Sequence, residues 1–297
     1  MNIVPSIKKL RIGKVLEHEP MSKHSTYKVG GKATIVYPRN IEKLISLIKL
    51  LKEKNVGYKV LGNGSNIIFK DEDYDGIIIN LKEFKDLIIE GTVIKVGAGY
   101  NLTQLAYKAS NLGLTGFEFA TGIPGTVGGA VYMNAGAYKT DMGYIVSEVR
   151  VLTPDLKIKT LYNKDMNFHY RTSFIKENPG YICLEAKIVL KRGRVLDILN
   201  LIEDRKQKRL MTQPLEYLSA GSVFRNPEND FAGRLIEECG LKGKMIGGAM
   251  ISEKHANFII NHGNASAKDI RDLINLAKSE VKKKFNIELY LEQEIIK

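Results

Sequence analysis

The feature that most constrains this chain is a glycine-rich stretch between residues 113 and 143. Its glycines stand at positions 113, 116, 122, 125, 128, 129, 136 and 143. Glycine has no Cβ and adopts positive φ at little cost, so a stretch of this kind lets the backbone approach a bound group closely. Because it also offers few side chains to a core, we expect residues 113–143 to contact a ligand.

Two segments match the requirements of an anion-binding cradle, in which backbone N–H groups converge on phosphate oxygens. One is the run from Gly122 to Ala130 within the stretch, where Thr126 adds a hydroxyl donor, and the other is Gly62-Asn63-Gly64-Ser65-Asn66. For the short segment alone, glycines that only shape a turn are an equal alternative. Neither segment fits the GxGxxG or P-loop fingerprints. Together they predict one large diphosphate ligand.

Composition places the chain among globular proteins and narrows its partners. The 297 residues are 44% hydrophobic and 26% charged, which predicts two or three folded domains. The net charge of +12 suits a polyanionic ligand, either a nucleotide or a nucleic acid. The densest basic clusters, 205–209 and 282–284, fall in helical patterns without interleaved aromatic residues. We therefore expect solvated helix faces there and no nucleic-acid partner.

The chain carries no signal that would direct it to or through a membrane. No apolar run approaches the roughly 18–20 residues of a membrane span, and the first residues lack the apolar core of a signal peptide. Cys183 and Cys239 stand apart from each other and from any metal-ligand cluster. We expect a cytoplasmic protein without membrane insertion, disulfide or bound metal.

Hydrophobic periodicity predicts a mixed α+β fold. Helices are expected at 40–55, 101–112, 195–209, 231–239 and 267–285, and strands at 58–61, 67–69, 77–79, 87–89, 93–96, 146–152 and 182–190. The strands between residues 77 and 96 are short, β-branched and separated by turn residues, so they are expected to be neighbours. A domain boundary is expected in the region 195–215.

Several ordered motifs resemble the UDP-N-acetylenolpyruvoylglucosamine reductase family from about Ser25 to Lys297. They are residues 25–31 (STYKVGG), 61–66 (LGNGSN), 116–130 (GFEFATGIPGTVGGA), 133–138 (MNAGAY), 170–171 (YR) and 219–227 (SAGSVFRNP). The resemblance implies a two-part FAD-binding region of the vanillyl-alcohol-oxidase (PCMH) type and a C-terminal α+β substrate-binding domain. The implied division is 1–85 and 86–200 for the two FAD-binding subdomains and 201–297 for the substrate-binding domain. No long insertion interrupts the motifs, as in the compact members of the family.

The same resemblance implies FAD as cofactor, NADPH as co-substrate and a UDP-sugar as substrate, whose enolpyruvyl group is reduced to give UDP-N-acetylmuramate in peptidoglycan precursor synthesis. The implied FAD-binding residues are Gly62, Asn63, Gly64, Ser65, Asn66, Thr121, Gly122, Pro124, Gly125, Thr126, Gly128, Gly129 and Ala130. Neither glycine segment contains a His or Cys that could tether the flavin. We therefore expect the FAD to be bound non-covalently. We also expect the protein to be a monomer.

Reduction of a vinyl ether beside a carboxylate needs an anion-stabilising cation and a proton donor. The resemblance assigns these catalytic roles to Arg171, Ser222 and Glu294. Gln293 stands where the family has a proline between two glutamates, as in Leu-Glu-Pro-Glu-Val. His255 is not expected to be catalytic. Contacts with the substrate are expected from Tyr138, Tyr170 and Arg225, because aromatic faces and a cation suit a uridine diphosphate sugar.

Two other functions are compatible with these features. A non-catalytic nucleotide- or polyanion-binding protein would use the same glycine segments and basic surface. An FAD oxidase of the same fold acting on an alcohol is the nearer alternative, although such enzymes commonly tether their flavin through a His or Cys. Flavin absorbance of the purified protein separates the first alternative from an enzyme.

Overall fold

The computed structural model describes residues 3–296 and divides the chain into two compact units, each assembled from separate segments. The first unit contains the segment that ends at Glu17, Thr34–Asn63 and Gly76–Lys206. The second contains His18–Ala33, Gly64–Asp75 and the chain from Gln207 onward. The division into 1–85, 86–200 and 201–297 remains a prediction.

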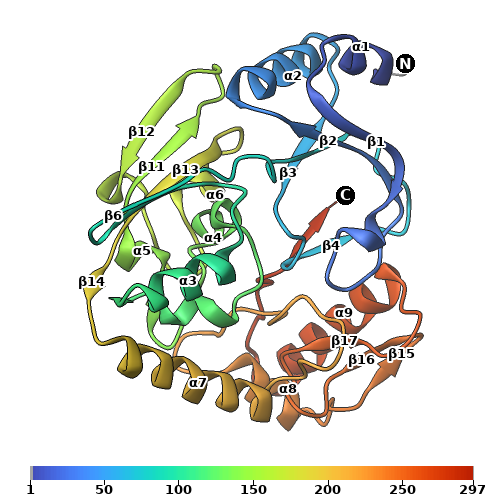
Figure 1. Cartoon of the computed structure of the whole chain (residues 1–297). Helices are drawn as coiled ribbons and strands as arrows, with labels where there is room; N and C mark the ends of the chain where they lie inside the picture. Colours follow the sequence, from blue (N-terminus) through green and yellow to red (C-terminus); the bar gives the residue numbers. More distant parts are fainter. Residues whose placement is uncertain (1–2, 297) are drawn as a thin grey trace. The chain divides into compact units, whose positions relative to one another are not determined.

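The first unit contains an antiparallel five-stranded sheet in the order β12-β11-β13-β7-β6. Its strands are β6 (Leu87–Glu90), β7 (Val93–Gly97), β11 (Val146–Leu152), β12 (Ile158–Tyr162) and β13 (Ile182–Val189). Helix α4 (Val127–Met133) packs against β13 and β7 (Figure 1). Helices α3 (Leu102–Asn111), α5 (Met142–Ile145) and α6 (Phe174–Glu177) belong to the same unit.

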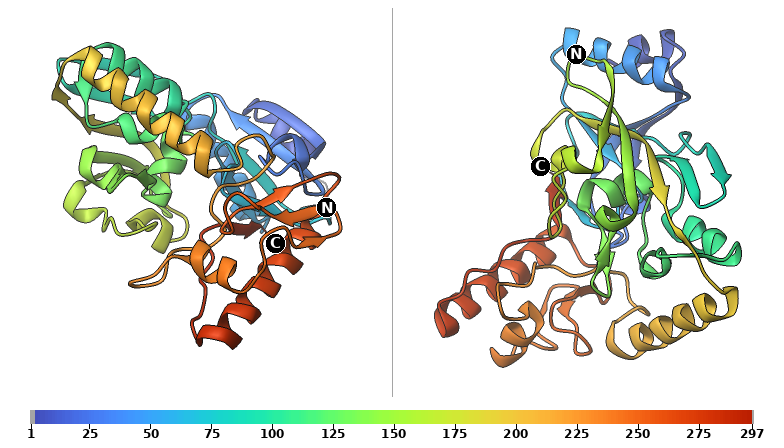
Figure 2. Two further views of the ribbon diagram at one scale, coloured as in Figure 1. Left: turned by 90° about the horizontal axis from the view of Figure 1, so that it is seen from below. Right: turned by 90° about the vertical axis from the view of Figure 1, so that its left-hand side faces the viewer.

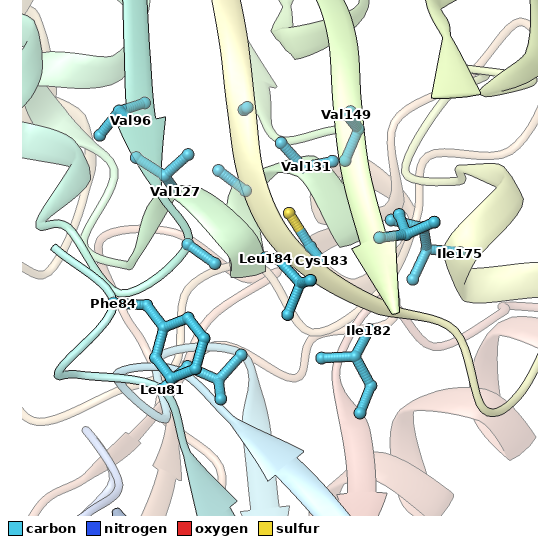
Figure 3. Close-up of a cluster of buried hydrophobic side chains, with 14 of the residues drawn as sticks. Leu81, Phe84, Val96, Val127, Val131, Val149, Ile175, Ile182, Cys183 and Leu184 are labelled. Carbon is cyan, nitrogen blue, oxygen red and sulfur yellow. The ribbon is translucent and has the colours of Figure 1, made fainter. Parts of the chain in front are cut away.

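The core of this unit forms where α4 meets the sheet (Figure 3). Val127 and Val131 are one helical turn apart on α4 and are fully buried. They gather with Val96 of β7, Val149 of β11 and Leu184 of β13. Since each buried aliphatic side chain contributes about 1.5–3 kcal/mol relative to exposure, this contact fixes α4 firmly on the sheet.

A second sheet, most of whose residues belong to the first unit, has the order β1-β2-β5-β3. Its strands are β1 (Gly13–Pro20), β2 (Lys32–Pro38), β3 (Tyr58–Leu61) and β5 (Ile77–Asn80). Strand β5 pairs in parallel with both β2 and β3. Helix α2 (Ile41–Glu53) connects β2 to β3, and helix α1 (Val4–Lys9) precedes β1.

The remaining short elements of this unit include four that lie within the glycine-rich stretch, and helix α7 continues from this unit into the second. The short elements and this helix are β8 (Leu114–Thr115), η2 (Glu118–Gly122), β9 (Gly136–Ala137), β10 (Thr140–Asp141), η3 (Asn163–Asp165), β14 (Lys191–Arg192) and α7 (Val195–Thr212). Strands β9 and β10 pair with each other, as do β8 and β14.

The second unit is built around helix α9 (Ala267–Phe285), which packs against β15 (Met245–Ile246), β16 (Ala249–Ile251) and α8 (Ala232–Glu238). Figure 2 shows α8 beside α9. The antiparallel sheet continues with β17 (Ile259–Asn261), and η1 (Met21–Lys23) also belongs here. Strand β4 (Ile67–Phe69) pairs in parallel with β18 (Glu294–Ile296), so two segments far apart in sequence lie side by side.

Local capping explains why the predicted helices begin where they do. The side chains of Asn40, Asn101 and Ser266 accept hydrogen bonds from backbone N–H groups in the first turns of α2, α3 and α9. Asp71 adds a cap from another segment, since its carboxylate accepts from the N–H groups of Ala267 and Lys268 at 2.7 and 2.9 Å. The expected mixed fold and the expected helices at 40–55, 101–112 and 267–285 are confirmed.

Two local predictions are wrong. The strand at 77–79 is not a neighbour of those at 87–89 and 93–96, because β5 pairs with β2 and β3 while β6 and β7 form a hairpin in the other sheet. No helix is predicted in the glycine-rich stretch, yet α4 begins at Val127, inside the segment from Gly122 to Ala130. In both places, long-range packing decides what local pattern leaves open.

Candidate active site

The two glycine segments meet within the first unit at Gly62 and Thr126. A Cβ on Gly62 would lie 2.7 Å from Oγ1 of Thr126, closer than a carbon and an oxygen can pack. The carbonyl of Gly62 accepts a hydrogen bond from Nδ2 of Asn80 at 3.1 Å. Glycine at position 62 is therefore required for the close approach of the two segments, which together form a candidate cofactor cradle.

Gly64 requires glycine for a different reason. Its φ of +65° lies in the left-handed region, which favours glycine. A Cβ at this position would lie only 2.0 Å from the carbonyl oxygen of His24 and would clash with it. Its own carbonyl accepts from the backbone N–H of Thr26 at 3.1 Å. In the second unit, the turn of Gly64, Ser65 and Asn66 is thus seated against the segment that contains Ser25 and Thr26.

In the longer segment, several backbone N–H groups bind within the protein. The N–H groups of Val127 and Gly128 donate to the carbonyls of Tyr100 and Ala98 at 3.0 and 2.8 Å. Thr126 caps α4, since its hydroxyl accepts from the N–H of Gly129 at 3.3 Å. Gly128 is primarily a packing residue, because a Cβ there would lie 2.8 Å from that of Ala98.

The preceding part of the segment is a short 3₁₀ turn ending at Gly122. The hydroxyl of Thr121 donates to the carbonyl of Glu118 at 2.9 Å. The buried carboxylate of Glu118 accepts from the hydroxyl of Thr115 and the N–H of Gly116 at 2.6 and 2.9 Å. The carbonyl of Gly125 accepts from the N–H of Leu102 at 3.1 Å. Pro124 lies between these anchors, and Ala130 is buried in α4.

Arg171 stands in a tight turn with φ of +58°, where His169 and Thr172 bond to each other. Its Nη2 donates to the carbonyl of Gly136 at 3.0 Å, and its guanidinium lies 5.0 Å from the ring centroid of Tyr170. Buried Asn134 fixes this turn, because its Nδ2 donates to the carbonyl of His169 at 2.9 Å. The structure therefore brings together Arg171, Tyr170 and the motif at 133–138.

Tyr138 is 40% exposed and packs against the last residues of the first unit. Its hydroxyl donates to the carbonyl of Arg205 at 3.0 Å, and the Arg205 guanidinium lies 4.6 Å from the ring centroid. The Arg205 guanidinium therefore helps to hold the ring of Tyr138 in place. The sequence predicts a solvated helix face for the cluster 205–209, and at Arg205 this is wrong because the guanidinium packs against the ring.

Ser222 lies in the second unit, in a loop whose backbone is bound on both sides. The N–H of Val223 donates to the carbonyl of Asn257 at 2.9 Å. The side chain of Asn257 accepts from the N–H of Phe224 and donates to its carbonyl, at 2.9 and 2.8 Å. Asn257 acts here as a strand partner would. The one sequence signal for this role is that Asn257 is a polar residue within an otherwise apolar run.

Glu294 begins strand β18, next to the Ser222 loop and the short glycine segment. Its N–H donates to the carbonyl of Asn66 at 3.0 Å, and Nδ2 of Asn66 donates to the carbonyl of Glu292 at 3.1 Å. The N–H of Glu292 in turn donates to the carbonyl of Val223 at 2.9 Å. The second unit thus brings together Asn66, Ser222 and Glu294.

Arg225 follows on the same loop, and its N–H donates to the carbonyl of Tyr290 at 2.9 Å. Arg171 belongs to the first unit, whereas Ser222, Arg225 and Glu294 belong to the second. Across residues 3–296 no group of three His, Cys, Asp or Glu side chains could hold a metal ion. Within the same range, no helix is long and apolar enough to cross a membrane.

Comparison with known proteins identifies the family. Residues 213–296 match the C-terminal domain of UDP-N-acetylenolpyruvoylglucosamine reductase, and residues 33–162 match an FAD binding domain. The reductase of Bacillus licheniformis is 44% identical over 99% of this chain and 98% of its own length. This chain belongs to the UDP-N-acetylenolpyruvoylglucosamine reductase family. The expected resemblance is confirmed.

Solved structures agree at the level of the fold. The crystal structure of the UDP-N-acetylenolpyruvylglucosamine reductase from Thermus caldophilus has a TM-score of 0.82 and 35% identity, covering 96% of this chain and 98% of that one. A glucose dehydrogenase, Phl p 4.0202, has a TM-score of 0.52 at 12% identity over 71% of this chain and 50% of its own. The fold of the chain is that of the vanillyl-alcohol-oxidase type with the C-terminal domain of the reductase family.

Proposed function

We propose that this chain reduces the enolpyruvyl group of UDP-N-acetylglucosamine enolpyruvate to UDP-N-acetylmuramate, with NADPH as the electron source, in peptidoglycan precursor synthesis. The observation that carries the proposal is 44% identity to a named reductase along 99% of the chain. In the reaction, the carbon–carbon double bond takes up two electrons and two protons, and NADPH is oxidised to NADP⁺.

The two glycine segments fit the expected FAD. Gly62 and Thr126 approach so closely that a Cβ at position 62 would intrude between them, which supports one ligand lying across both segments. The residues that would hold it are those from Gly62 to Asn66 and from Thr121 to Ala130. When bound, FAD supplies a relay that passes two electrons from NADPH to the substrate.

Arg171 is proposed to bind the substrate carboxylate and to stabilise the negative charge that develops on it. A guanidinium presents a planar fork of donors and stays charged at every working pH. The hydrogen bond to the Gly136 carbonyl and the contact with Tyr170 hold the group in place before the substrate arrives. Such preorganised donors are commonly the largest single contribution to catalysis.

Ser222 is proposed to donate the proton to the α-carbon, and Glu294 to support it by polarising the substrate carboxylate. A positioned hydroxyl can transfer a proton when it is held within reach of the developing carbanion. Supporting this assignment, the backbone of the Ser222 loop is hydrogen-bonded directly to the segment that leads into Glu294.

Tyr138, Tyr170 and Arg225 are proposed as contacts of the UDP-sugar, since two aromatic faces and a cation match a uracil ring and a diphosphate. Tyr138 and Tyr170 are 40% and 50% exposed, which leaves their rings accessible to a ligand. We further propose that the protein acts as a monomer in the cytoplasm. Its cysteines, Cys183 and Cys239, are free thiols, as a reducing compartment favours.

An anaerobic assay tests the proposed reaction in two stages. The purified protein is first mixed with NADPH or with NADH while the absorbance of the oxidised flavin is followed. The enolpyruvyl substrate is then added, and UDP-N-acetylmuramate is measured. We expect faster bleaching by NADPH and recovery of the absorbance with one equivalent of product. Bleaching without product on addition of the substrate would refute the proposed function.

A further inference from the structure

The side chain of Gln293 lies between the Ser222 loop and the segment of Glu294, and it is only 3% exposed. Its Nε2 donates to the carbonyls of Ala220 and Gly221, both at 3.1 Å. Its Oε1 accepts from the hydroxyl of Tyr27 at 3.2 Å. Both donors and the acceptor of this buried amide are therefore used, as a specific structural role requires.

Tyr27 determines which way the amide faces. Its side chain is fully buried, and this burial raises the pKa of Tyr27 well above the usual value near 10. The hydroxyl therefore keeps its proton at every working pH and needs an acceptor. Only the orientation with Oε1 toward Tyr27 satisfies the hydroxyl and also presents two N–H donors to the two carbonyls.

The bonds of Gln293 reach the residues just before Ser222, and the neighbouring backbone reaches the residue just after it. On the N-terminal side of Ser222, Nε2 of Gln293 donates to the carbonyls of Ala220 and Gly221. On its C-terminal side, the N–H of Glu292 donates to the carbonyl of Val223. Ser222 is consequently held from both directions by the segment that continues directly into Glu294.

We propose that Gln293 is a positioning residue that fixes the hydroxyl of Ser222 relative to the carboxylate of Glu294. This inference rests on the roles proposed above for these two residues. Position 293 is also where the chain departs from the proline expected from the family pattern. A proline carries no side-chain donor, so the two carbonyls would lose their partner, and the amide is a feature of this chain's own site.

The effect of Gln293 on catalysis follows from the precision that proton transfer demands. A displacement of about 1 Å can cost about 100-fold in rate. Methionine matches glutamine in length and lack of branching but neither donates nor accepts well. We therefore expect Gln293→Met to slow reoxidation of the reduced enzyme by the substrate about 10- to 100-fold, with KM changed much less than kcat.

The test measures both half-reactions of the holoenzyme, together with FAD content and the solvent isotope effect on reoxidation. For Gln293→Met, FAD content and reduction by NADPH should match the parent, while the solvent isotope effect should increase because proton delivery becomes slower. Gln104→Met, at an exposed position of α3, is the matched control and should leave both half-reactions unchanged. Parent-like reoxidation in Gln293→Met would overturn the inference.

Two further variants keep the test decisive if Gln293→Met folds poorly. Tyr27→Phe removes one hydroxyl, keeps the ring that fills the core, and should slow reoxidation by a smaller factor. In Gln293→Glu, the neutral carboxyl can still donate one hydrogen bond, so reoxidation should become slower as rising pH ionises it. An equal loss of FAD, of reduction and of reoxidation in these variants would instead indicate a purely structural role and overturn the inference.

A double variant separates this inference from the proposed function. If Gln293 acts through Ser222, Gln293→Met should add little to the loss already caused by Ser222→Ala. Full additivity would show that Gln293 acts elsewhere and would refute the inference alone. Parent-like reoxidation in Ser222→Ala would instead refute the role of Ser222, on which both proposals depend.

Discussion

The segment from Gly122 to Ala130 and the Ser222 loop achieve rigidity by opposite means. In the first, backbone packs against backbone, and Gly128 is required because Ala98 leaves no room for a Cβ. In the second, the side-chain amides of Asn257 and Gln293 bind the loop's backbone. The glycine segment, which is proposed to contact the cofactor, is rigid because small residues let its backbone pack closely. The Ser222 loop, which is proposed to position one hydroxyl, is rigid because side-chain amides bind its backbone.

The largest expected effect is that of Ser222→Ala, which should remove the proton donor and leave both kinds of rigidity intact. Losing a positioned general acid costs about 10²–10⁴ in rate. Reoxidation of the reduced enzyme by the enolpyruvyl substrate should slow by at least the lower end of that range, as measured by stopped-flow absorbance. Reduction by NADPH should be unchanged.

Ser219→Ala, in the same loop, serves as the control and should behave like the parent. Ser222→Cys should recover part of the rate, because a thiol also carries a transferable proton. If Ser222→Ala were reoxidised at the rate of the parent, water or Glu294 would have to donate the proton. The side-chain amides of Asn257 and Gln293 would then contribute to the stability of the loop and not to proton transfer.

The next effect is that of Arg171→Lys, which keeps the charge but removes the planar fork. Loss of a preorganised donor typically costs about 10²–10³ in rate, so reoxidation by the substrate should fall by about 100-fold. Reduction by NADPH should change far less. Both half-reactions are followed by stopped flow, with Arg192→Lys as an exposed control. Impaired reduction with normal reoxidation would contradict the proposed role of Arg171.

Gly128→Ala tests the region that is held by backbone packing. The added methyl would lie 2.8 Å from Cβ of Ala98, and overpacking of this kind costs about 1–3 kcal/mol. We expect the free energy of unfolding in urea to fall by that amount, together with weaker FAD retention on dilution.

Gly129→Ala is the matched control, because the nearest atom to its added methyl is Oγ1 of Thr126 at 3.4 Å. Its free energy of unfolding should be unchanged or slightly higher, since alanine is favoured over glycine inside a helix. The control applies to stability alone, because Gly129 is itself a proposed FAD-binding residue. Equal destabilisation by both substitutions would mean that the contact with Ala98 does not set the position of α4.

The smallest expected effect concerns His255, whose Nδ1 accepts from the N–H of Asn257 at 3.2 Å. Desolvation lowers the pKa of His255 below its ordinary 6.5, and Lys242 lowers it further. The unfolded chain therefore binds a proton first as pH falls, so this contribution to stability is complete above the ordinary pKa and is lost below it. The urea concentration at the unfolding midpoint of the parent should therefore decrease as the pH is lowered from about 7.5 to about 5.5.

His255→Asn should show a shallower fall over the same range, because its amide oxygen can accept the Asn257 N–H and carries no titrating proton. Asn257 holds the Ser222 loop, so this comparison reports on the loop that is held by side chains. Identical pH dependence of the two proteins would show that other groups govern the acid side.

Sequence reasoning predicts best where a signal is local. The apolar spacing of Leu44, Leu47, Ile48 and Leu51, preceded by Asn40, predicts α2 nearly to the residue. The helix predicted at 267–285 likewise coincides with α9, which Ser266 caps in the structure. The ordered motifs around the glycine segments also predict the family, because each motif combines residues that ordinary packing would not select.

What could not be predicted depends on contacts between distant residues. The amino-acid composition of β5 is compatible with a place beside β6 and with a place between β2 and β3. Its sheet is determined by parallel pairing with β2 and β3, which the local sequence does not reveal. The amide of Gln293 would be an ordinary polar side chain in an exposed segment. Its role arises from burial beside Tyr27 and Ala220, residues far away in sequence.

The parallel pairing of β4 with β18 has a consequence for how the protein folds. Glu294 is paired with Ile67, so forming this contact requires closing a loop that contains most of the chain. Such closure is entropically costly and slow, because non-local contacts must be made before they stabilise anything. During synthesis, the segment Gly64–Asp75 leaves the ribosome long before residues 294–296 exist. The proton-donating half of the site should therefore be the last part of the molecule to mature.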